Sequence, residues 1–278
     1  MLPLSLAVEI GTHFPSLRRL RYIIRCDDNS VGSNVMDLTR TPHIGALEIR
    51  GVGLQLMPYR FAPGWQLRCC RLGGGGVSGL FKMLASTRTT LESLQLDSGT
   101  TLANISSITE FPRLRELVLY GHLSQMFVAN LLAPSLDLLR FGKLTWIDVP
   151  KQSGFPDARI IIFHHLPPKF VREFFQLHPK VQRLCASVWN IQSIVAVWKD
   201  IPSEILANLE VLRVVQGLDV LDRNTFRHIL AINRRRPHPF VLEIDTLGQS
   251  LADIRQEFGP WLRIVGWITI SHVYPVVI

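Results

Sequence analysis

Cysteine is scarce in this chain and forms no regular framework. The 278 residues include four cysteines, and no two of them are spaced as CxxC. The N-terminal sequence MLPLSLAVEI has neither a basic segment nor an apolar core of useful length, so it does not match a secretory signal. We therefore expect free thiols in a reducing compartment, and a cytoplasmic or nuclear protein.

Long apolar runs and long polar tracts are also absent. No uninterrupted apolar stretch approaches the about 20 residues that a membrane-spanning helix needs, so we expect no membrane association. Hydrophobic residues make up 47% of the chain and charged residues 19%, a balance that excludes disorder over most of its length. The length allows one large domain, two small domains or a repeat array.

Signatures of catalysis and metal binding are missing. The nine histidines include no HExxH motif and no spacing with cysteine that is typical of a metal site, and no GxSxG motif occurs. His164 and His165 are adjacent on an expected strand, as are Cys69 and Cys70, so the members of each pair face opposite sides. We expect no catalytic centre, no metal and no cofactor.

Leucine, by contrast, is abundant, with 40 residues. The pattern L-x-x-L-x-L, in which L stands for any apolar residue, occurs eleven times at intervals of 22 to 30 residues. The copies open at Leu17, Ile44, Leu67, Leu91, Leu114, Leu136, Ala158, Val181, Leu209, Pro239 and Val265. Leucine-rich repeats have a period of about 20–29 residues. The sequence therefore predicts one leucine-rich-repeat domain over residues 1–278.

Proline positions support this assignment. Seven copies have proline two residues before the first apolar position, at Pro15, Pro42, Pro112, Pro134, Pro156, Pro179 and Pro237. Because proline cannot continue a helix and biases the preceding residue towards extended geometry, a helix should end and a strand begin there. Helical spacing occurs between the strands at 80–85, 125–132, 170–177, 191–206, 225–233 and 251–262. The predicted fold class is α/β: a curved parallel solenoid with the sheet on its concave side and helices on its convex side.

Three phrases carry a resemblance to a known family. They are Phe14-Pro-Ser-Leu17-Arg-Arg-Leu20, Phe111-Pro-Arg-Leu114-Arg-Glu-Leu117 and Ala133-Pro-Ser-Leu136-Asp-Leu-Leu139. They are similar to the irregular leucine-rich repeats of fungal F-box proteins, although no asparagine recurs at the ninth position. The resemblance implies the substrate receptor of a cullin–RING ubiquitin ligase, whose repeats bind the target while an F-box binds the ligase adaptor. Since the first copy opens at Leu17, we expect a truncated or degenerate member that would bind the adaptor only through an F-box upstream of this chain.

Two other functions stay open. The segment Gly74-Gly-Gly-Val-Ser-Gly79 matches G-x-G-x-x-G, follows an expected strand, opens an expected helix and precedes Asp97, as a dinucleotide-binding site requires. This would make the chain a Rossmann-like nucleotide-binding enzyme. Against it, the copies here repeat at 23 or 24 residues, whereas a βαβ unit needs about 30 or more.

The charge of +8 and a pI near 9.7 raise the second alternative, a basic nucleic-acid-binding protein. The 24 arginines are spread along the chain, and the only run is Arg234 to Arg236 at an expected helix end, where cations stabilise the helix dipole. That run is either a solvated helix end or a contact for an acidic partner or for nuclear import. The spread of the charges disfavours nucleic acid.

Counting the first apolar residue of each copy as position one, positions four and six should fill the core. Leu94, Leu117 and Leu139 are consecutive fourth positions and should stack in adjacent strands. Positions three, five and seven should project from the concave face. In copies one to three they are charged and include Arg19, Arg21, Glu48, Arg50 and Arg71.

In copies five to seven these positions become more apolar. They are Val118, Tyr120, Leu138, Arg140, Ile160, Ile162 and His164. An exposed apolar patch rimmed by Arg140 and Glu116 is typical of a protein interface, and tyrosine and arginine are enriched at interface hot spots. We predict that a target protein binds this patch on a monomeric receptor. The alternative is that a loop covers the face or that these strands are partly buried.

Overall fold

The structure, a computed structural model, divides the chain into two units, Met1–Asp157 and Ala158–Ile278. It describes residues 18–25, 36–39, 43–52, 59–61, 64–73, 80–96, 109–120, 131–143, 154–155, 157–200, 206–215, 223–244 and 256–265. This is an α/β protein with few helices, in which parallel sheet predominates. The described residues form 11 main sheet strands, six in the first unit and five in the second.

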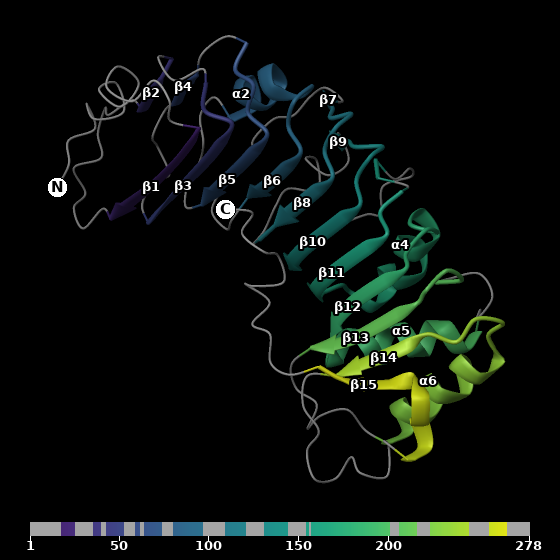
Figure 1. The fold of residues 1–278 in the computed structure, drawn as a ribbon. Coiled ribbons are helices and arrows are strands. Elements are labelled where there is room, and N and C mark those ends of the chain that lie inside the picture. Colours follow the sequence, from purple (N-terminus) through teal and green to yellow (C-terminus); the bar gives the residue numbers. More distant parts are fainter. Residues whose placement is uncertain are drawn as a thin grey trace. The chain divides into compact units, whose positions relative to one another are not determined.

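The six main strands of the first unit follow one another in chain order (Figure 1). They are β1 (Arg19–Arg25), β3 (Ala46–Val52), β5 (Cys69–Gly73), β6 (Ser93–Leu96), β8 (Glu116–Leu119) and β10 (Leu138–Lys143), and each neighbouring pair is parallel. Two short parallel pairs accompany them, β2 (Met36–Leu38) with β4 (Tyr59–Phe61) and β7 (Thr109–Glu110) with β9 (Leu131–Leu132). Helix α2 (Leu80–Thr87) connects β5 to β6.

The second unit is built in the same way, with more helix in the described residues. Its parallel strands are β11 (Ile160–His165), β12 (Arg183–Ser187), β13 (Val211–Val215), β14 (Val241–Ile244) and β15 (Leu262–Ile264), again in chain order. Its helices are η2 (Pro168–Phe170), α4 (Val171–Leu177), α5 (Val188–Asp200), α6 (Arg223–Arg235) and η5 (Gly259–Trp261). Helices α4, α5 and α6 lie on one face of this sheet (Figure 1).

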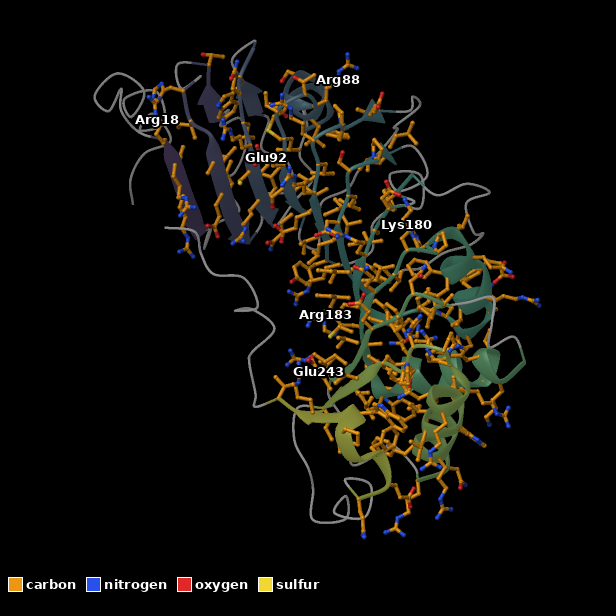
Figure 2. The ribbon with its side chains drawn as sticks, turned by 45° about the vertical axis from the view of Figure 1, so that its right-hand side comes forward. Arg18, Arg88, Glu92, Lys180, Arg183 and Glu243 are labelled. Carbon is orange, nitrogen blue, oxygen red and sulfur yellow. The ribbon has the colours of Figure 1, made fainter. Side chains whose placement is uncertain are left out.

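Strand residues alternate between a buried and an accessible side, as the sequence predicts. On β5, Cys70 and Leu72 are buried while Cys69 and Arg71 are exposed. In the second unit, Arg183 and Glu243 project on the side of the sheet opposite the helices (Figure 2). We call the side that carries positions three and five the open face of each unit.

The predicted core register is confirmed for Leu94, Leu117 and Leu139. Leu117 is paired with Leu94 on one side and with Leu139 on the other. Their exposed fractions are 0%, 0% and 3%. Aligned leucines from successive strands therefore form one continuous apolar row, as their spacing in the sequence predicts.

One backbone motif recurs at seven of the junctions between successive copies within a unit, from the first copy to the junction of β12 with β13. The carbonyl of the residue at position two accepts hydrogen bonds from two consecutive N–H groups of the next copy. The Glu92 carbonyl, for example, accepts from Arg115 at 2.8 Å and from Glu116 at 3.1 Å, and the Gln182 carbonyl accepts from Glu210 at 2.8 Å and Val211 at 3.0 Å. Consecutive copies are thus joined just before their strands begin.

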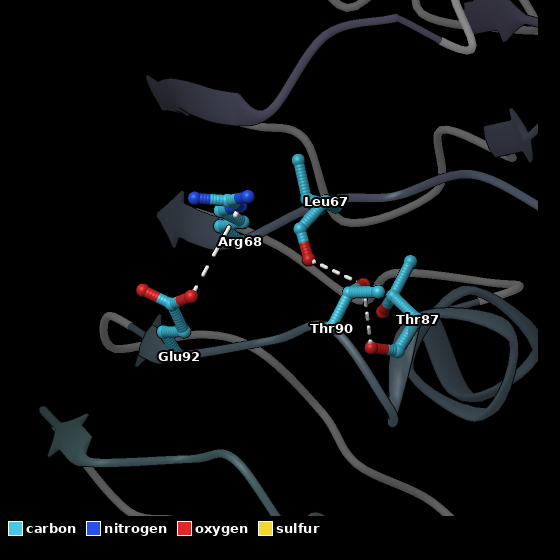
Figure 3. A network of polar contacts seen from close by, with 5 residues as sticks. All are labelled: Leu67, Arg68, Thr87, Thr90 and Glu92. Carbon is cyan, nitrogen blue, oxygen red and sulfur yellow. Dashed lines mark hydrogen bonds and ion pairs between the residues drawn. The ribbon is translucent and has the colours of Figure 1, made fainter.

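Side-chain hydrogen bonds also stabilise the turns between copies. Residues of several types form them, where a regular leucine-rich repeat has a recurring asparagine. In the first unit, Trp65 Nε1 donates to the carbonyl of Ile44 at 2.6 Å. Thr90 Oγ1 lies 2.9 Å from the Leu67 carbonyl and 3.1 Å from that of Thr87 (Figure 3). These contacts join position one of a copy to the residues that precede the next copy, so each turn is held by whichever polar group its sequence provides.

Asparagine does perform this task in the second unit, at irregular positions. Asn190 is 2% exposed. Its Oδ1 accepts from the backbone N–H of Leu166 at 2.9 Å, and its Nδ2 donates to the His164 carbonyl at 2.7 Å. Asn233 likewise accepts from the N–H of Phe240 at 2.8 Å and donates to its carbonyl at 3.0 Å. Both amides thus bond to backbone groups at the ends of neighbouring segments, among them the N–H groups of the buried residues Leu166 and Phe240.

The last two copies differ from the sequence prediction. The β14–β15 pairing aligns Leu242 with Leu262 and Ile244 with Ile264. The last copy therefore opens at residue 259, six positions before the predicted Val265. In the preceding copy, Pro239 is exposed and Phe240 is buried in its place. An apolar template cannot separate two overlapping apolar registers, nor choose between adjacent apolar residues.

One predicted helix is also wrong in its described part. Leu131 and Leu132, at the end of the predicted helix 125–132, form strand β9, and the rest of that segment lies outside the described residues. Leu131 is buried and Leu132 is exposed, the alternation of a strand. Two residues are too few for the sequence to distinguish a strand from a helical turn.

Candidate protein-binding face

The predicted patch falls on two units. Its first half lies on β8, on β10 and at Tyr120, the residue that follows β8. Tyr120 and Arg140 are half-buried, and the Arg140 guanidinium carbon lies 5.1 Å from the centroid of the Tyr120 ring. This is within the range of a cation–π contact. The two residues whose types favour an interface are therefore brought together, on the open face of the first unit.

Val118 and Leu138 correct the prediction of an exposed apolar patch. They are only 5% and 4% exposed. Val118 is aligned between Gln95 and Arg140 on the neighbouring strands, and Leu138 is aligned with Glu116. The aliphatic stems of long polar side chains cover short apolar neighbours. Partial burial, the alternative that the sequence left open, is what the structure shows for both.

The second half of the predicted patch lies on β11. Ile162 is 5% exposed, so the prediction of an exposed side chain is wrong here as well. Ile160 and His164 are half-buried. The His164 carbonyl accepts hydrogen bonds from Ser187 Oγ at 3.0 Å and Asn190 Nδ2 at 2.7 Å, which tie the end of β11 to the start of α5. Accessible surface in this half comes from Ile160 and His164.

Trp189 was missed by sequence reasoning. It is the second residue of α5 and its side chain is 66% exposed, although its neighbours Val188 and Asn190 are both buried. Tryptophan is enriched at binding hot spots. No periodicity could have singled it out, because its exposure follows from the way Asn190 turns inward to bond the end of β11.

Charged ladders occupy the fifth positions at one end of each unit. In the first unit the order along β1, β3 and β5 is Arg21, Glu48, Arg71, with Arg21 Nε 3.5 Å from Glu48 Oε2. The prediction of a charged surface in copies one to three is confirmed for the described side chains, while that of Arg50 lies outside them.

The second unit repeats this order in Arg213, Glu243 and Arg263 along β13, β14 and β15. Arg263 Nη1 lies 3.1 Å from Glu243 Oε1, and the Glu243 side chain is 7% exposed. The sequence did not reveal this second ladder, because the last copy was placed six residues too late. With the copy opening at residue 259, Arg263 falls at position five.

The thiols of Cys69 and Cys70 do not act together. Cys69 is exposed and Cys70 buried, so the two side chains separate as predicted. Burial raises the pKa of both thiols, and the carboxylates of Glu92 and Glu116 raise that of Cys69 further. Among the described residues, no three His, Cys, Asp or Glu side chains are grouped closely enough to hold a metal ion.

The motif that suggested nucleotide binding, residues 74–79, lies outside the described residues, as does Asp97. The strands around it can still be compared with a dinucleotide-binding sheet. Such a site forms where the strand order reverses. In the first unit the main strands run in chain order, without a reversal. This topology gives no support to the Rossmann-like alternative.

The three arginines at the end of α6 differ in their exposure. Arg234 and Arg235 are exposed, whereas Arg236 is half-buried. The Arg236 guanidinium donates to the carbonyls of Leu206, Ala207 and Leu209 at 2.8, 2.9 and 3.1 Å. Burial lowers its pKa. The run therefore presents two accessible cations, and its third member holds a turn.

In the part of the chain that the structure describes, no helix combines the length and the apolar character needed to cross a bilayer. Comparison with family models, curated proteins and solved structures finds no significant match.

Proposed function

We propose that this chain is a non-catalytic leucine-rich-repeat module that binds a target protein on the open faces of its sheets. The observation that carries the proposal is the difference between the two sides of each strand. Side chains at positions four and six are buried, while many at positions three and five are accessible and polar. A sheet side that is not packed into the core is available to another protein.

A solenoid of about eleven irregular repeats is the architecture that we propose for the chain. Three observations support it: parallel strands in chain order, the aligned fourth positions, and the recurring pair of hydrogen bonds to one carbonyl. In such arrays each repeat contacts mainly its neighbours, and binding surfaces extend over several repeats.

Within the predicted site, accessible side chains are the proposed contacts. Tyr120 and Arg140 form the centre in the first unit, and Ile160 and His164 provide accessible surface in the second. Val118, Leu138 and Ile162 lie on the same side of the sheet but are buried, so they are not proposed contacts. An aromatic ring held by an arginine combines two residue types that dominate binding hot spots.

The resemblance to F-box proteins suggests the biological setting. We propose that the module is the target-recognition arm of a ubiquitin-ligase receptor in the cytoplasm or nucleus, with adaptor binding left to an F-box upstream of this chain. The target protein binds the repeats, and neither a cofactor nor nucleic acid takes part.

The test is an affinity capture from native lysate with three forms of the full chain. A Tyr120→Ala, Arg140→Glu double variant changes the open face, and an Arg172→Glu, Gln176→Ala double variant makes matched changes at exposed positions of α4. We expect a defined set of proteins to bind the wild type and the α4 variant but not the open-face variant. Depleting the chain from cells should then lower ubiquitylation of those proteins. Equal capture by all three forms, with unchanged melting temperatures, rejects the site.

A further inference from the structure

The open face at the start of the first unit carries an excess of positive charge. Its third and fifth positions on β1, β3 and β5 are described in full, and we call them the arginine face: Arg19, Arg21, Ala46, Glu48, Cys69 and Arg71. The three arginines are exposed. Three cations against one anion give a local charge of +2.

Glu48, the one anion of the face, neutralises one of the three cations, so the charge of two arginines remains. Its carboxylate lies 3.5 Å from Arg21 Nε, and its side chain is 18% exposed against 58% for Arg21. Ion pairs of this accessible kind contribute little to folding. Arg21 can therefore turn towards a carboxylate of another protein at small cost, while Arg19 and Arg71 flank it.

The spacing of the arginines matches an extended peptide. Arg19 and Arg21 are two residues apart on one strand, about 6.6–6.8 Å, which is also the distance between alternate side chains of any extended chain. Arg71 stands two strands away from Arg21, about 9.4–9.8 Å. Glu48 lies between Arg21 and Arg71 in this row. In the neighbouring row, aligned with Arg19, the third positions of β3 and β5 carry the short side chains of Ala46 and Cys69, so a peptide backbone can approach the sheet there.

We infer that the arginine face binds an acidic segment of the target protein in extended conformation, with carboxylates at alternate residues paired to Arg19 and Arg21 and a further carboxylate to Arg71. This inference rests on the proposed function, of which it specifies the partner. Charge complementarity is the reason for choosing this occupant, because complementary charges determine which partner associates and how fast.

Two observations favour a peptide over a nucleic acid. None of the six residues of the arginine face is aromatic, so bases have no ring to stack on, whereas proteins that bind single strands combine basic grooves with stacking rings. Glu48 within the face, and Glu116 at position three of β8, would repel a continuous phosphate backbone. A peptide with carboxylates only at alternate residues can place them beside the arginines and away from Glu48 and Glu116.

The experiment measures fluorescence anisotropy of a labelled peptide of alternating glutamate and threonine, added to the full chain. An Arg19→Glu, Arg71→Glu variant reverses the arginine face, and an Arg88→Glu, Arg227→Glu variant makes the same charge change after α2 and on α6, at exposed positions. We expect the dissociation constant to rise about tenfold or more in the first variant and to stay within about twofold in the second. Binding should also weaken between about 50 and 200 mM salt.

Several outcomes would overturn the inference. These are equal weakening by both variants, equal binding of a peptide of alternating glutamine and threonine, and tighter binding of an oligothymidine that the first variant abolishes. Affinity capture separates this failure from that of the proposed function. If capture still depends on Tyr120 and Arg140 while the acidic peptide does not bind, the acidic partner is rejected and the protein-binding module stands.

Discussion

Arg236 holds Leu206 in an unfavourable backbone conformation. The Arg236 Nη1 donates a hydrogen bond of 2.8 Å to the Leu206 carbonyl, and Leu206 has a φ of 55°. It is the only non-glycine residue with positive φ among those the structure describes. A left-handed conformation costs a residue with a side chain about 1–2 kcal/mol. The end of α6 thus stabilises the turn before β13.

Replacing Arg236 with alanine should lower the free energy of unfolding by about 2 kcal/mol, because three carbonyls lose a charged donor. The contacts with the rings of Trp198 and Phe240, at 5.6 and 5.5 Å, are lost as well. Arg236→Lys should restore only part of the loss, since an ammonium cannot reproduce the planar fork. Urea unfolding measures both. Arg235→Ala, at an exposed position, is the control and should change little; an equal effect there would refute the role of Arg236.

Leu117→Asp tests the strand register. Leu117 is 0% exposed between Leu94 and Leu139. A carboxylate there has no partner and should cost several kcal/mol, enough to leave the chain insoluble or without a cooperative melting transition. Glu116→Gln, one residue away on the accessible side, weakens only the hydrogen bond that Glu116 Oε2 accepts from Ser93 Oγ at 2.9 Å, so the melting curve should stay close to that of the wild type. Cooperative melting of Leu117→Asp at the wild-type temperature would mean that the register is wrong.

Asn190→Ala should destabilise the second unit by about 2–3 kcal/mol, because it leaves the buried N–H of Leu166 and the carbonyl of His164 without this partner. Asn224→Ala is the matched control, since Asn224 is exposed on α6. Hydrogen exchange provides the local readout: the Leu166 amide should exchange much faster in Asn190→Ala. Unchanged protection would show that the amide does not hold this turn.

Thiol reactivity follows from the pKa shifts of Cys69 and Cys70. Both pKa values are raised, so at about pH 8 less thiolate is present than in free cysteine, whose pKa is about 8.5. Iodoacetamide reacts with the thiolate. It should modify Cys69 slowly, and the rate should keep rising with pH in the range where the rate for free cysteine no longer rises. It should modify Cys70 only on unfolding. Mass spectrometry of modified peptides checks both; fast labelling of Cys70 in the folded chain would contradict its burial.

The same shift of Cys70 sets the direction of a stability change. The folded state keeps the proton where the unfolded chain has lost it, so this contribution to stability is complete below the unfolded pKa of about 8.5 and declines as pH rises above it. Denaturant midpoints measured across the alkaline range should therefore fall with rising pH.

Much of the sheet could be predicted because its signal is local and repeated. Leu94, Leu117 and Leu139 each recur at the same offset from a preceding apolar residue, and the structure aligns them. The last copy could not be placed, because Leu262 and Ile264 fit the apolar template and so do the residues after Val265. Only pairing with β14 decides between the two registers.

The candidate site was less predictable, since accessibility depends on neighbours that are distant in sequence. Val118 was assigned to the correct side of its strand, yet it is buried between Gln95 and Arg140, which lie 23 and 22 residues away in sequence. Trp189 is exposed because the next residue bonds another strand. Neither fact is contained in a single strand's pattern of apolar and polar residues.

The recurring pair of hydrogen bonds to a single carbonyl has a consequence for biosynthesis. Each copy completes its bonds with the copy synthesised just before it, and within a unit none of the main strands waits for a partner from the far end of that unit. Ribosomes add about 5–20 residues per second, so a new copy emerges every few seconds, long after a local contact can form. We expect each unit to fold in order from its N-terminal strand while translation continues.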